Sequence, residues 1–220
     1  RLAATVLYNG VNWGNGIINV LKGQRDNPQG NANATPTGYY TRKYIPEVIL
    51  NNNHTGSDYR NWIIIRYAEI LLSYAEALNN LTGPHTVELD GQPYTMSRDK
   101  EEIKKAFNQV RYRAGLPGLT ANQLNSTPEV QKQIRERMVE FLWENRRFYD
   151  VRRWGIYEET EQEPIRGMNP DGATKETYYQ RVIPSSSSFL TRVVDKRSVW
   201  VPIPRNEMRR LPSLDQNPGY

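Results

Sequence analysis

The chain has 220 residues, of which 37% are hydrophobic, so it can bury a core within one or two domains. Its net charge of +5 comes from Lys and Arg interleaved with Asp and Glu, which argues against a nucleic-acid-binding surface. Because cysteine is absent, disulfides, thiolate catalysis and cysteine-ligated zinc are excluded within this sequence.

Residues 1–60 are rich in Gly, Asn, Pro and Tyr. Two extended patches, Ala4–Tyr8 and Ile17–Leu21, are separated by turn-forming dipeptides such as Asn9-Gly10. The pattern predicts a loop-rich segment with short strands that packs on a core formed elsewhere.

A helix is predicted over Asn61–Leu81, where apolar residues recur at helical spacing until Gly83-Pro84. Because further isoleucines extend the apolar character around the cylinder, the helix is expected to be largely buried. They are Ile63, Ile64, Ile65 and Ile70. Arg66 and Glu69 interrupt this densest apolar run, so it does not read as a membrane span.

Two more helices follow. One is predicted from Asp99 to Gly115, after a polar connection over residues 84–96 with a turn at Asp90-Gly91. Asp99 and Glu102 have the spacing of a capping box. The other is predicted as one continuous helix from Thr127, its N-cap, to Asp150.

Residues 155–190 are polar and are expected to form a long excursion that is only partly ordered. In the tail, prolines limit regular structure to a short strand at Val199–Ile203 and a helical turn at Asn206–Leu211. Because apolar residues persist between the prolines, the tail is expected to be packed down.

The first two helices have spacings common in tetratricopeptide pairs. A lone pair cannot close a solenoid, since each repeat buries its face on its neighbours, so further helices are expected upstream. The predicted fold is mostly α, with a tetratricopeptide-like helical core, loop-rich irregular segments and short strands. Two domains are expected, at residues 1–60 and 61–220, the second including the excursion.

Four blocks, in order along the chain, resemble the SusD/RagB family of outer-membrane glycan-binding lipoproteins. They are NWIIIRYAEILLSYAEALNN, FNQVRYRAGLPGL, IRERMVEFLWENRRFYDVRRWG and the tail from Val199 to Tyr220, which ends in QNPGY. The resemblance implies the C-terminal portion of such a protein. It also implies non-enzymatic capture of glycan or another nutrient at the cell surface and delivery to a SusC-like TonB-dependent transporter. A lipid-bearing cysteine upstream of Arg1 would be the anchor in the outer membrane.

Glu136, Glu140 and Glu144 recur every four positions and so align on one helix face. Such a row could serve glycoside hydrolysis, which needs two acids across a scissile bond. Nearby arginines favour the other interpretation, an ion-pair lattice tying helices together, because they would disarm a general acid. The expected partners are Arg66, Arg111, Arg113, Arg137 and Arg147. No catalytic residue is therefore assigned.

No metal or cofactor site is predicted. The two histidines, His54 and His85, stand apart in polar turn-rich surroundings, without partners for zinc or a catalytic triad. Asn169-Pro-Asp-Gly172 lacks the alternating acids of a calcium loop and is interpreted as a turn.

Aromatic residues outside the helical stripes are the candidate ligand contacts, because sugars present apolar faces to flat rings and hydroxyls to neighbouring polar groups. The predicted contacts are Tyr8, Trp13, Tyr39, Tyr40, Tyr59 and Trp62, with Tyr178 and Tyr179 in a further aromatic loop. Two alternatives remain open: a tetratricopeptide-type protein-interaction scaffold and a glycoside hydrolase.

Overall fold

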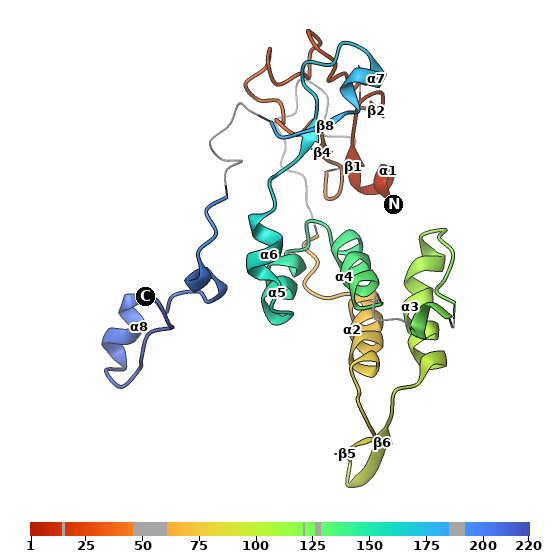
Figure 1. The fold of residues 1–220 in the computed structure, drawn as a ribbon, viewed down its shortest axis with the longest axis vertical. Coiled ribbons are helices and arrows are strands. Elements are labelled where there is room, and N and C mark those ends of the chain that lie inside the picture. Colours follow the sequence, from red (N-terminus) through yellow and green to blue (C-terminus); the bar gives the residue numbers. More distant parts are fainter. Residues whose placement is uncertain (15, 46–60, 121, 126–128, 185–191) are drawn as a thin grey trace. The chain divides into compact units, whose positions relative to one another are not determined.

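The computed structural model describes the chain except for residues 15, 46–60, 121, 126–128 and 185–191, and the side chains of 125 and 129–134 (Figure 1). Contacts divide it into two units. The helical unit comprises Arg1 and residues 61–147, and the split unit comprises residues 2–60 and 148–220. The described part is mostly helical, with paired short strands and no closed sheet, which confirms the predicted fold class. The predicted division into residues 1–60 and 61–220 stays a prediction.

The helical unit is built on two antiparallel helices, α2 (Tyr67–Asn79) and α3 (Lys100–Arg113), with α4 (Glu129–Glu140) and the 3-10 turn η2 (Asn122–Asn125) beside them. The Asp99 carboxylate caps α3 by accepting hydrogen bonds from two backbone N–H groups, as predicted. Apolar side chains of α2 and α3 and of the segment after α3, with Phe141, form its core.

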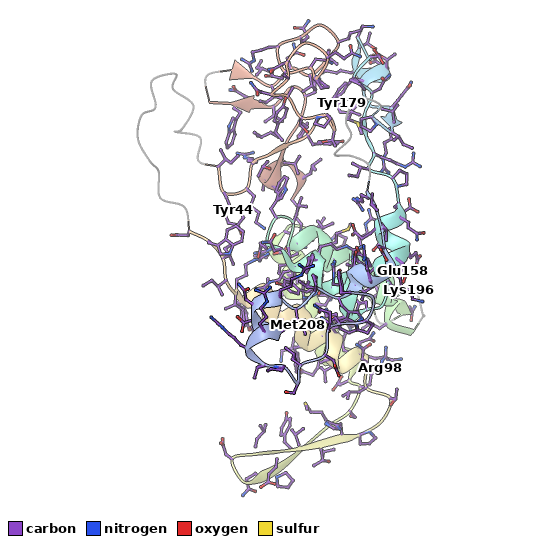
Figure 2. All side chains as sticks on the ribbon, turned by 90° about the vertical axis from the view of Figure 1, so that its left-hand side faces the viewer. Tyr44, Arg98, Glu158, Tyr179, Lys196 and Met208 are labelled. Atoms are coloured by element: carbon purple, nitrogen blue, oxygen red, sulfur yellow. The ribbon has the colours of Figure 1, made fainter. Side chains whose placement is uncertain are left out.

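The connection between α2 and α3 is a β-hairpin, which the sequence did not predict beyond its turn. Strands β5 (His85–Leu89) and β6 (Gln92–Met96) pair antiparallel and extend beyond the ends of the two helices (Figure 1). Asp90 and Gly91 both have positive φ, the geometry of a tight two-residue hairpin turn. Arg98, at the foot of the hairpin (Figure 2), donates hydrogen bonds to the Asn79 side chain and the Leu124 carbonyl.

The prediction of a long, largely buried first helix was wrong. Helix α2 begins six residues later than expected, and its buried side chains lie on one stripe only. Ile64 is 79% exposed, and Ile65, Tyr67 and Ile70 are also exposed. Among the described elements, α2 packs mainly on α3 and α4, so apolar residues on its other sides stay exposed in this part of the chain.

The third predicted helix is interrupted. α4 ends at Glu140, and α5 (Arg146–Arg153) begins after a turn in which Trp143 and Asn145 have positive φ. A continuous helix cannot contain these left-handed conformations. The predicted cap, Thr127 with Pro128, lies outside the described residues.

The split unit is formed by two segments that lie far apart in the sequence, residues 2–60 and 148–220. Its first part contains α1 (Leu2–Thr5), β1 (Val6–Leu7), β2 (Asn12–Trp13), β3 (Gly16–Ile17) and β4 (Tyr40–Thr41). Its second part contains α5, α6 (Tyr157–Gln162), β7 (Gly167–Met168), α7 (Lys175–Tyr178), β8 (Arg181–Val182), η4 (Lys196–Val199) and α8 (Arg205–Arg210). Strands pair as β1–β4, β2–β3 and β7–β8.

The excursion is therefore more ordered than predicted over its described residues, 155–184. Its order comes from packing on the N-terminal segment. Tyr178 is buried with Val20 and Met168, and its hydroxyl donates to the Gly38 carbonyl at 3.2 Å. At Gly38, a Cβ would lie 2.1 Å from that hydroxyl oxygen, so only glycine fits there.

The tail closes on itself through polar contacts. The Gln216 side chain bonds both backbone groups of Ile203, and Asn217 donates to the Val201 carbonyl. Helix α8 matches the predicted helical turn. The strand predicted at Val199–Ile203 is not formed: Val199 ends η4, and Trp200 to Ile203 pair with no strand of the described residues. Trp200 and Val201 remain exposed, so the expected apolar packing of the tail is wrong for these residues.

Candidate functional site

The row of carboxylates lies in the helical unit. Glu136 and Glu140 are on α4, and Glu144 is in the turn that follows; all three are buried. The break after α4 thus leaves Glu144 where Arg66, the N-cap residue of α2, reaches both it and Glu140.

Arg66, at the N-cap of α2, joins two of these carboxylates. Its Nε and Nη2 donate to the two oxygens of Glu144, each at 2.8 Å, and its Nη1 donates to Glu140 at 2.6 Å. Its guanidinium also lies 4.9 Å from the centre of the Phe141 ring. Burial alone lowers the pKa of Arg66, but the hydrogen bonds to Glu144 and Glu140 outweigh it and raise the pKa above the ordinary value.

Helix α3 supplies the cations for the rest of the row. Arg111 Nη1 lies 2.9 Å from Glu136, and Arg113 pairs with Glu140. Arg1 pairs with Glu136 from the start of the chain. The other expected partner on α5, Arg147, is half-buried.

Two more pairs join α2 to its neighbours: Arg137 of α4 with Glu76 at 3.8 Å, and Arg146, the first residue of α5, with Glu69 at 2.7 Å. Together the pairs link α2, α3, α4 and the start of α5. A buried carboxylate held by one or more guanidiniums is poorly placed to hand a proton to a substrate, so the arrangement favours architecture over acid–base chemistry.

The predicted ligand-contacting rings fall in different places. Trp13 is only 8% exposed, and the Arg42 guanidinium covers its ring at 5.1 Å. Tyr8 is half-buried, whereas Trp62, in the helical unit, is 62% exposed. Tyr59 lies outside the described residues. All six assignments stay predictions.

Four tyrosines gather in the split unit: Tyr39, Tyr40, Tyr178 and Tyr179. Tyr178 and Tyr179 meet edge to face, with ring centres 5.3 Å apart. The Tyr40 hydroxyl donates to the Asp26 carbonyl at 3.0 Å and that of Tyr179 to the Asn9 carbonyl at 3.3 Å. Tyr39 is half-buried and Tyr179 is 43% exposed, so one side of the cluster is accessible to solvent.

Burial raises the pKa values of three of these phenols, Tyr39, Tyr40 and Tyr178, which favours their neutral form. Burial raises the pKa of Tyr178 far above its ordinary value, with further increases from Tyr39 and Tyr179. Burial also raises the pKa of Tyr39, where the neighbouring Tyr179 adds to the increase and Arg181 opposes it. Neutral phenols can both donate and accept hydrogen bonds, as binding a sugar hydroxyl requires.

The sequence did not predict the scaffold behind this cluster. The fully buried Asn27 side chain donates to the Val20 and Pro170 carbonyls, at 2.9 and 2.8 Å, joining the two parts of the split unit. Gln29 donates to Asp171 at 2.6 Å across the same seam. The Asn169–Gly172 turn is thus a docking element; its Asn-Pro-Asp-Gly composition indicated a turn but not a partner.

Metal and membrane features are limited. Among the described residues, no group of three His, Cys, Asp or Glu side chains could hold a metal ion. His54 is outside those residues, and His85 is exposed on β5. No described helix is both long and apolar enough to cross a bilayer.

Comparison with known proteins gives a consistent result. The SusD family model matches residues 1–220. SusD-like protein P2 of Formosa agariphila is 27% identical over 185 residues, which cover 81% of this chain and 30% of that protein. The crystal structure of a SusD-like protein from Bacteroides fragilis is 31% identical, with a TM-score of 0.70 over 99% of this chain and 38% of the other. The chain therefore spans about a third of the length of these relatives.

Proposed function

Because the chain belongs to the SusD family, we propose that the protein binds glycan or another nutrient at the bacterial cell surface and delivers it, chemically unchanged, to a TonB-dependent outer-membrane transporter. The family match over the whole chain supports capture of nutrient glycans in general. The SusC-like transporter as partner, the cell-surface location and a lipid anchor upstream of Arg1 form part of the same proposal.

The observation that carries the proposal is the solvent-accessible side of the tyrosine cluster. Tyr39 and Tyr179 expose part of their rings, and Arg181 beside them is exposed and able to donate. A flat ring accepts the C–H face of a sugar, while a guanidinium and phenol hydroxyls bond the surrounding hydroxyl groups. The buried Tyr178 and the Asn27 seam hold these rings on a fixed backbone.

The carboxylate row supports the non-enzymatic part of the proposal. A glycosidase needs one carboxylic acid and one carboxylate facing a shared cleft. Here Glu140 and Glu144 are tied to Arg66, and Glu136 to Arg111. No nucleic-acid partner, cofactor or metal is included in the proposal.

Binding of the purified chain to a panel of immobilised glycans, followed by calorimetry with the best ligand, tests the proposal. Tyr179→Ala should weaken binding about threefold to tenfold, the range expected for loss of one stacking ring. Tyr149→Ala, which removes an exposed ring from α5, is the matched control and should bind like the parent chain. Trp62→Ala tests the exposed ring of the helical unit in the same way.

Absence of binding to every glycan would contradict the proposal. Equal weakening by Tyr149→Ala and Tyr179→Ala would remove the tyrosine cluster as the contact surface.

One observation favours a second function, a protein-interaction scaffold. Ile64, Ile65, Tyr67 and Ile70 present an exposed apolar face along the start of α2. Contiguous exposed apolar surface of this kind marks sites where another protein surface packs. A chain that binds no saccharide but loses a protein partner on Ile70→Asp would favour this function.

A further inference from the structure

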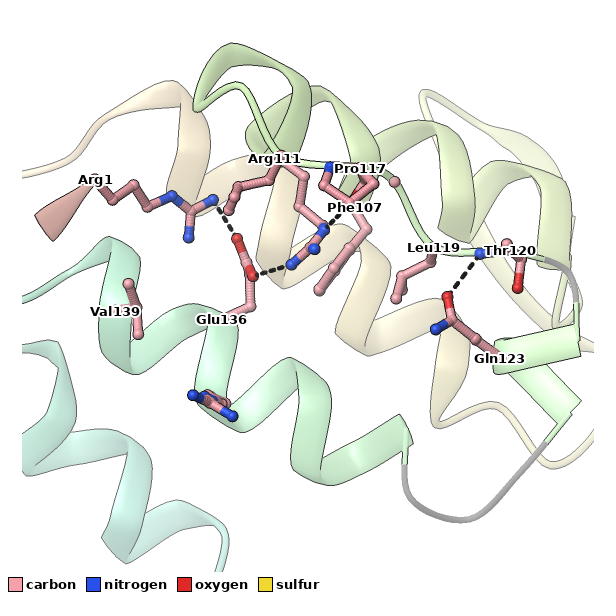
Figure 3. Close-up of a pocket in the computed structure, with 12 residues that line it drawn as sticks. Arg1, Phe107, Arg111, Pro117, Leu119, Thr120, Gln123, Glu136 and Val139 are labelled. Carbon is pink, nitrogen blue, oxygen red and sulfur yellow. Dashed lines mark hydrogen bonds and ion pairs between the residues drawn. The ribbon is translucent and has the colours of Figure 1, made fainter.

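The helical unit contains a pocket of about 620 Å³ between the loop after α3 and the end of α4 (Figure 3). This volume is within the range of small-molecule sites, roughly 300–1,000 Å³. Its apolar lining comes from two sides, Leu116 and Pro117 in the loop after α3 and Val139 on α4, and its polar groups come from Thr120, Gln123 and three arginines.

Positive charge exceeds negative charge in the lining. Arg1, Arg111 and Arg135 contribute three guanidiniums, and Glu136 is the one acidic residue that lines the pocket within the described part of the chain. Arg1 and Arg111 both point at Glu136, as Figure 3 shows, so a single carboxylate is shared between two cations. Arg135 is exposed and forms no ion pair within the described part of the chain. The pocket therefore favours an anionic group.

The wall opposite α4 is fixed by side chains of α3. Asn108 is buried and bonds both backbone groups of Leu119, accepting from its N–H at 2.6 Å and donating to its carbonyl at 3.2 Å. A Cβ on Gly118 would lie 2.6 Å from the Asn108 amide nitrogen, so the loop lies directly on α3.

Arg111, the cation of α3 in this wall, is also held by two hydrogen bonds. Arg111 Nε donates to the Pro117 carbonyl at 2.6 Å and its Nη1 donates to Glu136 at 2.9 Å. These two bonds use Nε and Nη1 of Arg111 and do not involve its Nη2. The guanidinium is thus oriented in advance for a ligand, which lowers the entropy lost on binding.

We propose that this pocket binds a carboxylate-bearing sugar residue, a uronic acid, with its carboxylate at Arg111 and Arg135. The inference rests on the proposed function, glycan capture, and names a class of glycan for it. Of the lining side chains, Leu116 and Val139 supply apolar contacts for the C–H groups of the sugar ring. Gln123 and Thr120 supply hydrogen-bonding groups for the sugar hydroxyls. A bare inorganic anion would leave the apolar lining and most of the pocket volume without contacts, which favours a sugar acid over phosphate as the ligand.

Calorimetric titration of the full chain with D-glucuronate, D-glucose and inorganic phosphate tests the proposal. Glucuronate should bind, and glucose, which lacks the carboxylate, should bind at least about tenfold more weakly, as expected for loss of a charge-assisted contact. Raising the salt concentration should weaken glucuronate binding, because the contact is ionic and partly exposed.

Two variants probe the pocket. Arg135→Gln removes a cation that lines the pocket. Gln123→Glu adds a negative charge while keeping an oxygen to accept from the Thr120 N–H, as Gln123 does at 2.9 Å. Each should weaken glucuronate binding about tenfold or more. Arg209→Gln, an exposed arginine on α8, is the matched control and should have no effect. Circular dichroism melting curves verify that all three variants fold.

Each contrary result overturns the inference. Equal affinity for glucose and glucuronate would exclude recognition of the carboxylate, and equal affinity for phosphate would leave a general anion site. Binding unchanged in Arg135→Gln and Gln123→Glu would move the ligand elsewhere. If neutral glycans still bind through Tyr179 in that case, the proposed function stands while the acidic-sugar pocket fails.

Discussion

At the scale of single residues, the contribution of an arginine to stability depends on how deeply it is buried and on how many carboxylates it pairs with. The Arg66 side chain is 20% exposed and serves two buried carboxylates, whereas that of Arg113 is 58% exposed and serves Glu140, which also has Arg66. Removing a buried partner leaves an uncompensated charge, while removing an exposed one leaves water in its place. The spacing of the glutamates identified the row, but not which arginine each would meet.

Arg66→Met should therefore lower the free energy of unfolding of the helical unit by about 3 kcal/mol, since Glu140 and Glu144 both lose a guanidinium. Arg113→Met should lower it by less than about 1 kcal/mol. Denaturant unfolding monitored by far-ultraviolet circular dichroism measures both. Equal effects of the two substitutions would contradict the assignment of Arg66 as the central cation.

Tyr178 gives a prediction about alkaline pH. A tyrosine ordinarily has a pKa of about 10, and burial raises that of Tyr178 in the folded chain. The unfolded chain then loses this proton first as the pH rises. The contribution of the neutral phenol to stability is accordingly complete below about pH 10 and falls above it.

The comparison of the parent chain with Tyr178→Phe isolates the contribution of the Tyr178 hydroxyl to stability. At pH 8 the variant should be less stable by about 1 kcal/mol, because the hydrogen bond to the Gly38 carbonyl is lost. At pH 11 the difference in unfolding free energy should be smaller or reversed. A difference that stays constant between the two pH values would show that the phenol of Tyr178 titrates normally.

At the scale of elements, the sequence predicted caps, helical stripes and turns, because contacts within a few residues determine these features. Asp99, the apolar stripe from Ile103 to Val110 and the Asp90-Gly91 turn all act within a few residues, and the structure agrees with each. The break between α4 and α5 was missed because Trp143 and Asn145 show no helix-breaking signal; their left-handed geometry places Glu144 against Arg66. Tertiary ion pairing outweighs helix propensity there.

Asn145 tests that explanation. Its φ of 60° is tolerated by Asn and suits Gly, but strains other residues. Asn145→Ala should lower the free energy of unfolding by about 1 kcal/mol, and Asn145→Gly should leave it unchanged or raise it slightly. Thermal melting of both variants distinguishes them. An alanine variant as stable as the parent would mean that the turn readily rejoins α4 and α5 into one helix.

At the scale of the whole molecule, sequence patterns identified the family and the fold class, but not the pairing of distant segments. Residues 167–182 meet residues 20–40 where Asn27 donates to the Pro170 carbonyl, where Tyr178 packs against Gly38 and where the Lys22 N–H donates to the Gly172 carbonyl. These contacts join positions more than a hundred residues apart, and no periodicity within either segment encodes them. The same pairing forms the tyrosine surface, which is why single aromatics in the sequence could not be ranked as ligand contacts.

The central claim is that exposed rings hold a saccharide by contact alone, while the acidic and basic side chains tie helices together. Incubating the purified chain with its best-bound glycan, then separating the products by chromatography, tests it most directly. The account predicts that the glycan is recovered intact, with binding weakened by Tyr179→Ala. Shorter oligosaccharides that appear with the parent chain and disappear with Glu140→Gln would contradict it.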